Sequence, residues 1–246
     1  ERDIKFPCIV KPTDSPTFVS IFRTKTFLCK NMEELNKSLQ LAKDANQEVI
    51  VQRIVPGFDD NMFTFDAHVN QDSKVTHWVT CQKHRQYPIN FGASVYTEQV
   101  YVQELYDIGA PFLEALGYKG FAEIEFKKDE KTGKYYLIEI NVRTTTLNIL
   151  LYKAGINFPF VAYRELIGKP LEPKAVRKNT GIMFRYLHED LLAIRDYIKA
   201  GQLDYSVIFE PLFRKKAPAI WSFDDPKPGL AYFLMLMKKV GQRITS

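Results

Sequence analysis

The feature that most constrains the fold is a pair of alternating segments within residues 120–143, GFAEIEFKKDEKTGKYYLIEINVR. Residues 121–126 and 135–142 are rich in β-branched and aromatic side chains, as strands usually are. The residues DEKTGK between them have the composition of a turn. Because successive side chains in a strand point to opposite faces, the pattern predicts a β-hairpin with one apolar face and one charged face.

The charged face of this hairpin gathers carboxylates. Glu123 and Glu125 share a face of the first strand, and Glu139 and Asn141 share a face of the second. In an antiparallel pair, residues whose numbers sum to an even value face the same side, so Glu125, Glu139 and Asn141 can converge. Crowded carboxylates repel one another and are costly to desolvate, and a cation would relieve both costs. Their hard oxygen atoms suit Mg²⁺.

Arg143 follows Asn141 on the same face, two residues further along the strand. Its fork-shaped guanidinium would lie beside the cation as a donor to phosphate or carboxylate oxygens. The alternative is a hairpin with one solvated, charged face, which is common in antiparallel sheets. The pattern alone leaves both interpretations open.

The segments EIEF and YYLIEINVR, joined by their turn, resemble the metal-binding end of the ATP-grasp superfamily. In that family an acidic or amide residue on one strand and a Glu-x-Asn-x-Arg segment on the next hold magnesium between the phosphates of ATP. The resemblance implies Glu125, Glu139 and Asn141 as ligands of Mg²⁺, with Mn²⁺ as an alternative. It also implies Arg143 as a catalytic residue at the transferring phosphoryl group.

Upstream segments resemble the nucleotide-binding parts of the same family. FPCIVKP is similar to the strand whose lysine contacts the α-phosphate, and EVIVQRIVPG is similar to the interdomain hinge that borders adenine. Family members often carry a glycine-rich phosphate loop near residues 13–29, but this segment has no glycine and offers Arg23, Thr24 and Lys25 instead. Asp59 or Asp60 would lie near the ribose. The implied ATP contacts are Lys11, Lys25, Gln52, Arg53, Ile54, Val55 and Asp60.

A loop is expected at residues 84–94, HRQYPINFGAS. Arg85 occupies a position where related ligases carry a basic residue, and the resemblance implies that it is a catalytic residue that binds phosphate or the carboxylate substrate. An ordinary surface arginine is the alternative.

Other elements follow from periodicity and capping residues. Two strands joined at NQDSK are expected within residues 61–83, and EVIVQRIVPG reads as another strand. Helices are expected at residues 31–45, 97–116 with a kink or break at Pro111, 144–155, 159–168, within HEDLLAIRDYIKAG, and from about residue 229.

These elements predict an α+β fold of the ATP-grasp type, in which two α+β lobes clamp ATP. The expected domains are a small lobe at 1–56, a large lobe with the metal site at 57–175, and a helical C-terminal extension at 176–246. Most family members also have an upstream α/β domain, and we expect that this sequence lacks it.

Composition limits the class of protein and of ligand. The net charge is +5, and the Lys and Arg residues are interleaved with acidic residues along the chain. This pattern favours small anionic ligands such as nucleotides over nucleic acid. Three cysteines without a CxxC pair predict reduced thiols and a cytoplasmic protein. The apolar run GLAYFLMLM is too short to span a membrane, and no membrane partner is expected.

The site and the resemblance together predict an ATP-dependent carboxylate–amine ligase that forms an acyl phosphate and releases ADP and phosphate. The C-terminal segment resembles that of bacterial ligases related to D-aspartate ligase, and the whole is similar to carbamoyl-phosphate synthase-like ATP-grasp proteins. The expected partners are a small carboxylate and an amine, and homo-oligomerisation is left open. The alternatives are a kinase or phosphotransferase of the same fold and a non-catalytic ATP-binding module.

Overall fold

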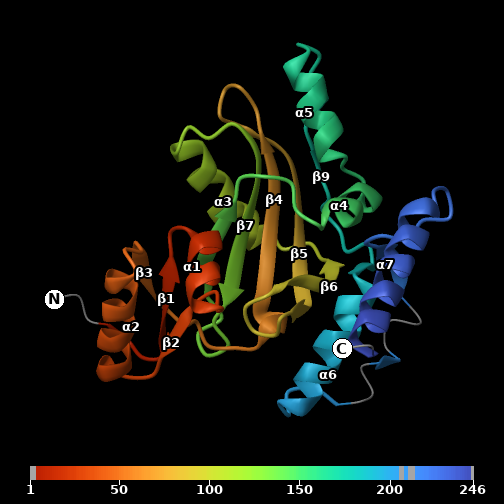
Figure 1. The fold of residues 1–246 in the computed structure, drawn as a ribbon. Helices are drawn as coiled ribbons and strands as arrows, with labels where there is room; N and C mark the ends of the chain where they lie inside the picture. The colour runs from red at the N-terminus through yellow and green to blue at the C-terminus, as the bar shows by residue number, and fades with distance from the viewer. Residues whose placement is uncertain (1–3, 205–207, 210–213, 245–246) are drawn as a thin grey trace. The chain divides into compact units, whose positions relative to one another are not determined.

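The computed structural model describes residues 4–204, 208–209 and 214–244. The chain divides into two compact units, Glu1–Pro56 and Gly57–Ser246 (Figure 1). Each unit has its own sheet and its own buried core, so each is described by itself.

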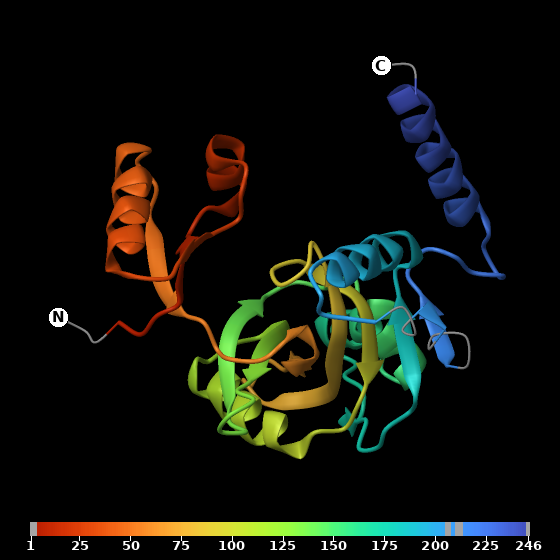
Figure 2. The ribbon, with the colours of Figure 1, turned by 90° about the horizontal axis from the view of Figure 1, so that it is seen from below.

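The small unit contains one three-stranded antiparallel sheet in the order β2-β1-β3. Helix α2 lies alongside the sheet (Figure 2), where Leu35 joins Cys8, Val10 and Cys29 in a buried cluster. The elements of this unit are β1 (Cys8–Pro12), α1 (Ser15–Phe22), β2 (Phe27–Cys29), α2 (Met32–Asp44) and β3 (Val49–Arg53).

Capping explains both helices of the small unit. Asn31 caps α2, within the range predicted to be helical, by accepting a hydrogen bond from the backbone N–H of Glu34 at 2.9 Å. Helix α1 is not among the helices predicted from the sequence. Asp14 caps this helix and Pro16 stands in its first turn, a combination that favours a helix start.

The large unit is built on an eight-stranded sheet. Seven strands follow the order β11-β10-β6-β5-β4-β7-β8, and β9 pairs with β5 beside this path. Its strands are β4 (Met62–Val69), β5 (Val75–Tyr87), β6 (Ala93–Gln99), β7 (Gly120–Lys128), β8 (Tyr135–Asn141), β9 (Lys174–Ala175), β10 (Ile182–Arg185) and β11 (Lys215–Pro218). Its helices are η1 (Asp59–Asn61), α3 (Gln103–Ala115), α4 (Asn148–Ala154), α5 (Phe158–Leu166), α6 (Leu187–Lys199) and α7 (Lys227–Ile244).

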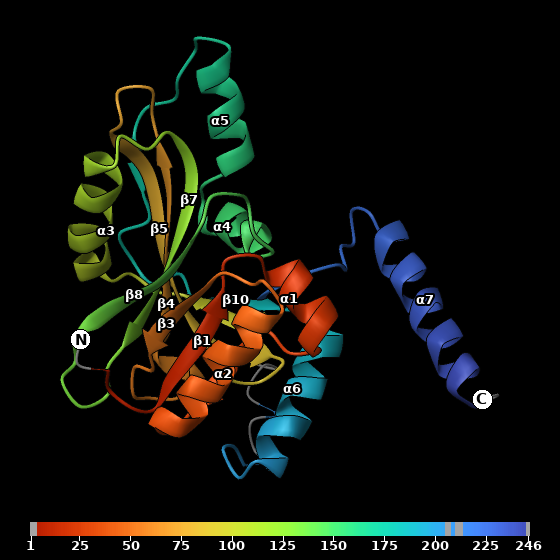
Figure 3. The ribbon, with the colours of Figure 1, turned by 60° about the vertical axis from the view of Figure 1, so that its left-hand side comes forward.

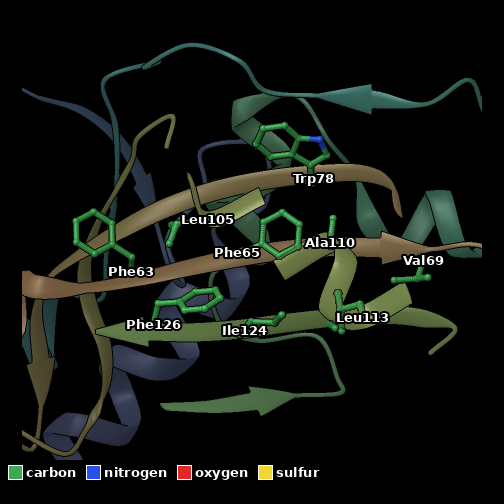
Figure 4. Close-up of a cluster of buried hydrophobic side chains, with 11 residues drawn as sticks. Phe63, Phe65, Val69, Trp78, Leu105, Ala110, Leu113, Ile124 and Phe126 are labelled. Atoms are coloured by element: carbon green, nitrogen blue, oxygen red, sulfur yellow. The ribbon is translucent and has the colours of Figure 1, made fainter. Parts of the chain in front are cut away.

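Helices cover both faces of this sheet. Helix α3 lies on one face and α4 and α5 lie on the other (Figures 1 and 3). Phe63 and Phe65 of β4 pack with Ile124 of β7 in the apolar core under α3 (Figure 4). Gly109 lets α3 approach closely, because a Cβ there would lie 2.6 Å from Cδ1 of Phe65. By alternation, Asp66 of β4 faces the opposite side, toward α4 and α5.

Most predicted elements of the large unit are confirmed, with four corrections. The hairpin, the strand pair around NQDSK and the helices that end near Gly155 and Gly168 are present, but the first of these helices begins at Asn148 and not at residue 144. Residues 84–87 continue strand β5 and do not belong to a loop. Residues 97–99 belong to β6, so the helix begins at Gln103, and it continues through Pro111.

The C-terminal segment contains the predicted helices α6 and α7, and also two strands. Strand β10 pairs with β6, and β11 pairs with β10, so both extend the sheet of the large unit. Within the described residues no helix is both long enough and apolar enough to cross a lipid bilayer.

Candidate active site

The predicted hairpin is confirmed, and its charged residues lie opposite one another. Glu125 lies opposite Glu139, and Glu123 lies opposite Asn141. The turn is held by Asp129, whose Oδ1 accepts hydrogen bonds from the backbone N–H groups of residues 131 and 132 at 2.9 and 3.2 Å. Because directly opposed residues in antiparallel strands point to the same face, these four side chains share one surface of the sheet.

Strand β4 adds a further carboxylate to this surface. Asp66 lies opposite Glu123 and is fully buried, and its Oδ2 accepts a hydrogen bond from Thr64 Oγ1 at 2.7 Å. Burial and then the charge of Glu123 raise the pKa of Asp66 well above its ordinary value. Burial and the charge of Glu125 also raise the pKa of Glu123. The raised pKa of Asp66 favours its protonated form beside Glu123.

Glu123 also orients the residues around it. Asn141 Nδ2 donates to Glu123 Oε1 at 3.1 Å, and Thr145 Oγ1 donates to Glu123 Oε2 at 2.7 Å. With its amide nitrogen turned toward Glu123, Asn141 directs its amide oxygen elsewhere, which leaves that oxygen suitable for a cation. Thr145 ties the segment before α4 to the same carboxylate.

Lys83 of β5 reaches the acidic surface and was not predicted. Its Nζ lies 2.7 Å from Glu125 Oε2, and both side chains are largely shielded from solvent. Burial lowers the pKa of Lys83, but Glu125, Glu123 and Glu139 raise it by more, so its net pKa is raised and the ammonium stays charged. The sequence contains one signal for the position of Lys83, the alternation that places it on the same face of β5 as Val79 and Cys81. Alternation does not show which strands lie beside β5, so it could not predict the contact with Glu125.

The predicted ligands fit a hard divalent cation that also binds a nucleotide. Glu125, Glu139 and Asn141 supply two carboxylates and an amide oxygen, and Mg²⁺ usually completes its octahedron with water and phosphate oxygens. In the part of the chain that the structure describes, no cluster of three or more His, Cys, Asp or Glu side chains could hold a metal ion. Three protein ligands leave positions of the octahedron open to phosphate oxygens, so the set suits a cation shared with phosphates.

The two arginines predicted to be catalytic have different surroundings. Arg143 is exposed just after β8, and its Nη1 donates to the carbonyl of Thr144 at 3.4 Å. Arg85 is buried, and it donates through Nε and Nη2 to Asp190 of α6 at 2.6 and 3.2 Å. Its guanidinium also lies 3.9 Å above the ring of Tyr96. The alternative of a surface loop arginine is therefore wrong, and a catalytic role for Arg85 stays a prediction.

The predicted nucleotide contacts are divided between the two units. Of the two aspartates considered for the ribose, Asp60 is exposed, whereas Asp59 is buried. Asp59 accepts hydrogen bonds from Gln86 Nε2 at 2.7 Å, from the backbone N–H of Asn90 at 2.9 Å, and from the Tyr197 hydroxyl. Its carboxylate is thus committed within the large unit. The small unit carries the remaining predicted contacts. Lys11 lies in β1, and Lys25 is exposed. Gln52 and Arg53 end β3, and Ile54 and Val55 follow it directly.

Comparisons with known proteins bear on this arrangement. No protein-family model matches the sequence. The chain is 31% identical to D-aspartate ligase from Enterococcus faecium (strain Aus0004) over 180 residues, which covers 69% of this chain and 42% of that protein. It is 27% identical over 163 residues to the carbamoyl phosphate synthase large chain of Methanobrevibacter smithii, covering 62% of this chain and 15% of that protein.

Solved structures show the same fold. Biotin carboxylase from Campylobacter jejuni superposes with a TM-score of 0.55 at 14% identity, over 69% of this chain and 39% of that one. The chain belongs to the ATP-grasp superfamily. The predicted fold class is thereby confirmed. The chain spans less than half the length of the relatives it matches.

Proposed function

We propose that this ATP-grasp chain carries the ATP- and metal-binding part of an ATP-dependent carboxylate–amine ligase. The observation that carries the proposal is the convergence of Glu125, Glu139 and Asn141 on one face of the β7–β8 hairpin. The relationship to D-aspartate ligase supports it, because that ligase and this chain share 31% identity over 180 residues.

In the proposed reaction the γ-phosphoryl group of ATP passes to a substrate carboxylate. This gives ADP and an acyl phosphate, and attack by an amine on the acyl carbon then forms the C–N bond and releases phosphate. Bound Mg²⁺ supplies charge neutralisation at the phosphate oxygens. Glu125, Glu139 and Asn141 would hold the cation in place, and Arg143 would donate to the transferring phosphoryl group. Lys11 contacts the α-phosphate, so the protein acts mainly through positioning and electrostatics.

The similarity to D-aspartate ligase suggests the first substrate to test. D-aspartate is a small dicarboxylate, and an amine acceptor is the second substrate that such a ligase needs. We therefore place D-aspartate first in a panel of amino-acid carboxylates, each combined with a panel of amines.

The experiment measures ADP release by the complete protein with ATP, Mg²⁺ and these pairs, together with mass spectrometry of the products. We expect an amide product in step with ADP, and at least a 100-fold loss of turnover in Glu139→Ala. Glu130→Ala is the matched control, because Glu130 is an exposed acid in the turn of the same hairpin. A phosphorylated product without amide would replace the ligase with a kinase, and nucleotide binding without ADP release would indicate a binding module.

A further inference from the structure

One cation is already present on the acidic surface. Lys83 is only 2% exposed, and its Nζ lies 2.7 Å from Glu125, one of the predicted metal ligands. The charges of Glu123 and Glu139 act on the same ammonium. A lysine so fully removed from water needs these carboxylates, and they in turn lose part of their mutual repulsion.

Several carboxyl groups share this ammonium. Glu123, Glu125 and Glu139 all act on the charge of Lys83. A divalent cation could bring more positive charge to the same oxygens, but it would compete with Lys83 for Glu125. Two cations on one carboxylate repel each other, so a divalent cation bound by Glu125 would weaken the contact between Lys83 and that carboxylate.

A second acceptor lies beside Lys83. Thr97 of β6 is its cross-strand partner, and the buried Thr97 Oγ1 has no hydrogen-bond partner. Side chains of such partners are close neighbours on one face of the sheet. The flexible lysine stem can therefore turn from Glu125 toward this hydroxyl without leaving the sheet surface.

We propose that Lys83 is an exchangeable counter-ion, which holds Glu125 in place before a divalent cation binds and releases it when the cation arrives. The inference rests on the proposed metal site, to which it adds a positioning residue that sets the affinity for the cation. Lys83 preserves the geometry of Glu125 in the metal-free state, and competition from its ammonium keeps the cation weakly bound until phosphates contribute their oxygens.

The experiment is thermal unfolding of the chain in increasing MgCl₂ without nucleotide, at ionic strength held constant with NaCl. We expect Lys83→Met to lower the metal-free Tm by about 5 °C or more, because it leaves buried carboxylates uncompensated. MgCl₂ should restore most of that loss, with its half-maximal effect at roughly tenfold lower concentration than in the wild type.

Two further variants keep the result interpretable. Lys83→Gln keeps a hydrogen-bond donor without the charge, so it should show the same Mg²⁺ response with a smaller loss of Tm, even if Lys83→Met does not fold. Lys74→Met is the matched control, because Lys74 forms a 2.8 Å ion pair with Glu114 on the exposed surface. It should titrate with MgCl₂ as the wild type does.

The contrary outcomes are distinct. If MgCl₂ restores neither Lys83 variant while ATP with Mg²⁺ still stabilises the wild type, Lys83 is a fixed structural ion pair and the proposed function stands. If the wild type responds to Mg²⁺ neither alone nor with ATP, the metal site itself fails, and the counter-ion role fails with it.

Discussion

The large unit contains two buried charge clusters with opposite balance. In the arginine clamp, Arg85 of β5 and Arg185 of β10 each place Nε 2.6 Å from one carboxylate, Asp190 of α6. In the acidic surface, as far as the described residues show, the carboxyl groups of Asp66, Glu123, Glu125 and Glu139 gather around Lys83.

The difference separates a structural role from a binding role. The clamp joins α6 to the sheet through paired charges, and it uses every oxygen of Asp190 in doing so. The acidic surface retains two carboxyl groups with raised pKa values and an amide oxygen turned away from its neighbour. A bound cation can neutralise crowded carboxyl groups of this kind. The carboxylate of Asp190 already has both oxygens paired, so it has little capacity to bind a further ligand.

The largest expected effect is on the clamp. Asp190→Ala would leave Arg85 and Arg185 near each other without their shared anion, which should cost about 3–5 kcal/mol of stability. Equilibrium unfolding in urea measures this loss. A loss below about 1 kcal/mol would show that the clamp contributes no more than a surface ion pair, and the contrast between the clusters would disappear.

A smaller effect is expected where α6 meets the start of the large unit. The Tyr197 hydroxyl donates to Asp59 and accepts from the backbone N–H of Gln86. Tyr197→Phe removes both bonds from a buried position and should cost about 1–2 kcal/mol, measured by the same urea titration. A variant as stable as the wild type would show that α6 is held by the clamp alone.

The two buried aspartates provide a matched test of protonation. Because the raised pKa of Asp66 favours its neutral form, Asp66→Asn should cost less than about 1 kcal/mol at pH 7. Asp190→Asn removes a charge paired with two arginines and should cost about 3 kcal/mol. Equal losses in the two variants would contradict the assignment of a proton to Asp66.

The sign of the pH dependence follows from the raised pKa of Asp66. The folded state binds this proton more tightly than the unfolded state, so the resulting stabilisation is complete below the unfolded pKa of about 4. It is lost as the pH rises through the raised folded value. Asparagine does not titrate, so Asp66→Asn should gain stability relative to the wild type as the pH increases from about 4, measured by unfolding at each pH.

Period-two alternation and turn residues were sufficient to predict the hairpin. They placed Glu125, Glu139 and Asn141 on one face, because antiparallel register within a hairpin follows from its own sequence. Pairing between distant segments was not predictable in this way. Lys83 meets Glu125 only because β4 lies between β5 and β7, and Arg85 meets Asp190 across 105 residues of sequence.

The most direct test of the central claim is the thermal shift produced by ATP with and without Mg²⁺, in the wild type and in Glu139→Ala. Half-buried Glu139 lies at the end of the acidic surface, so its loss should change the Tm without ligand by less than about 2 °C. We predict that ATP stabilises the wild type only with Mg²⁺, and that Glu139→Ala loses this stabilisation. An equal Mg²⁺-dependent shift in both proteins would contradict the placement of the metal on the β7–β8 hairpin.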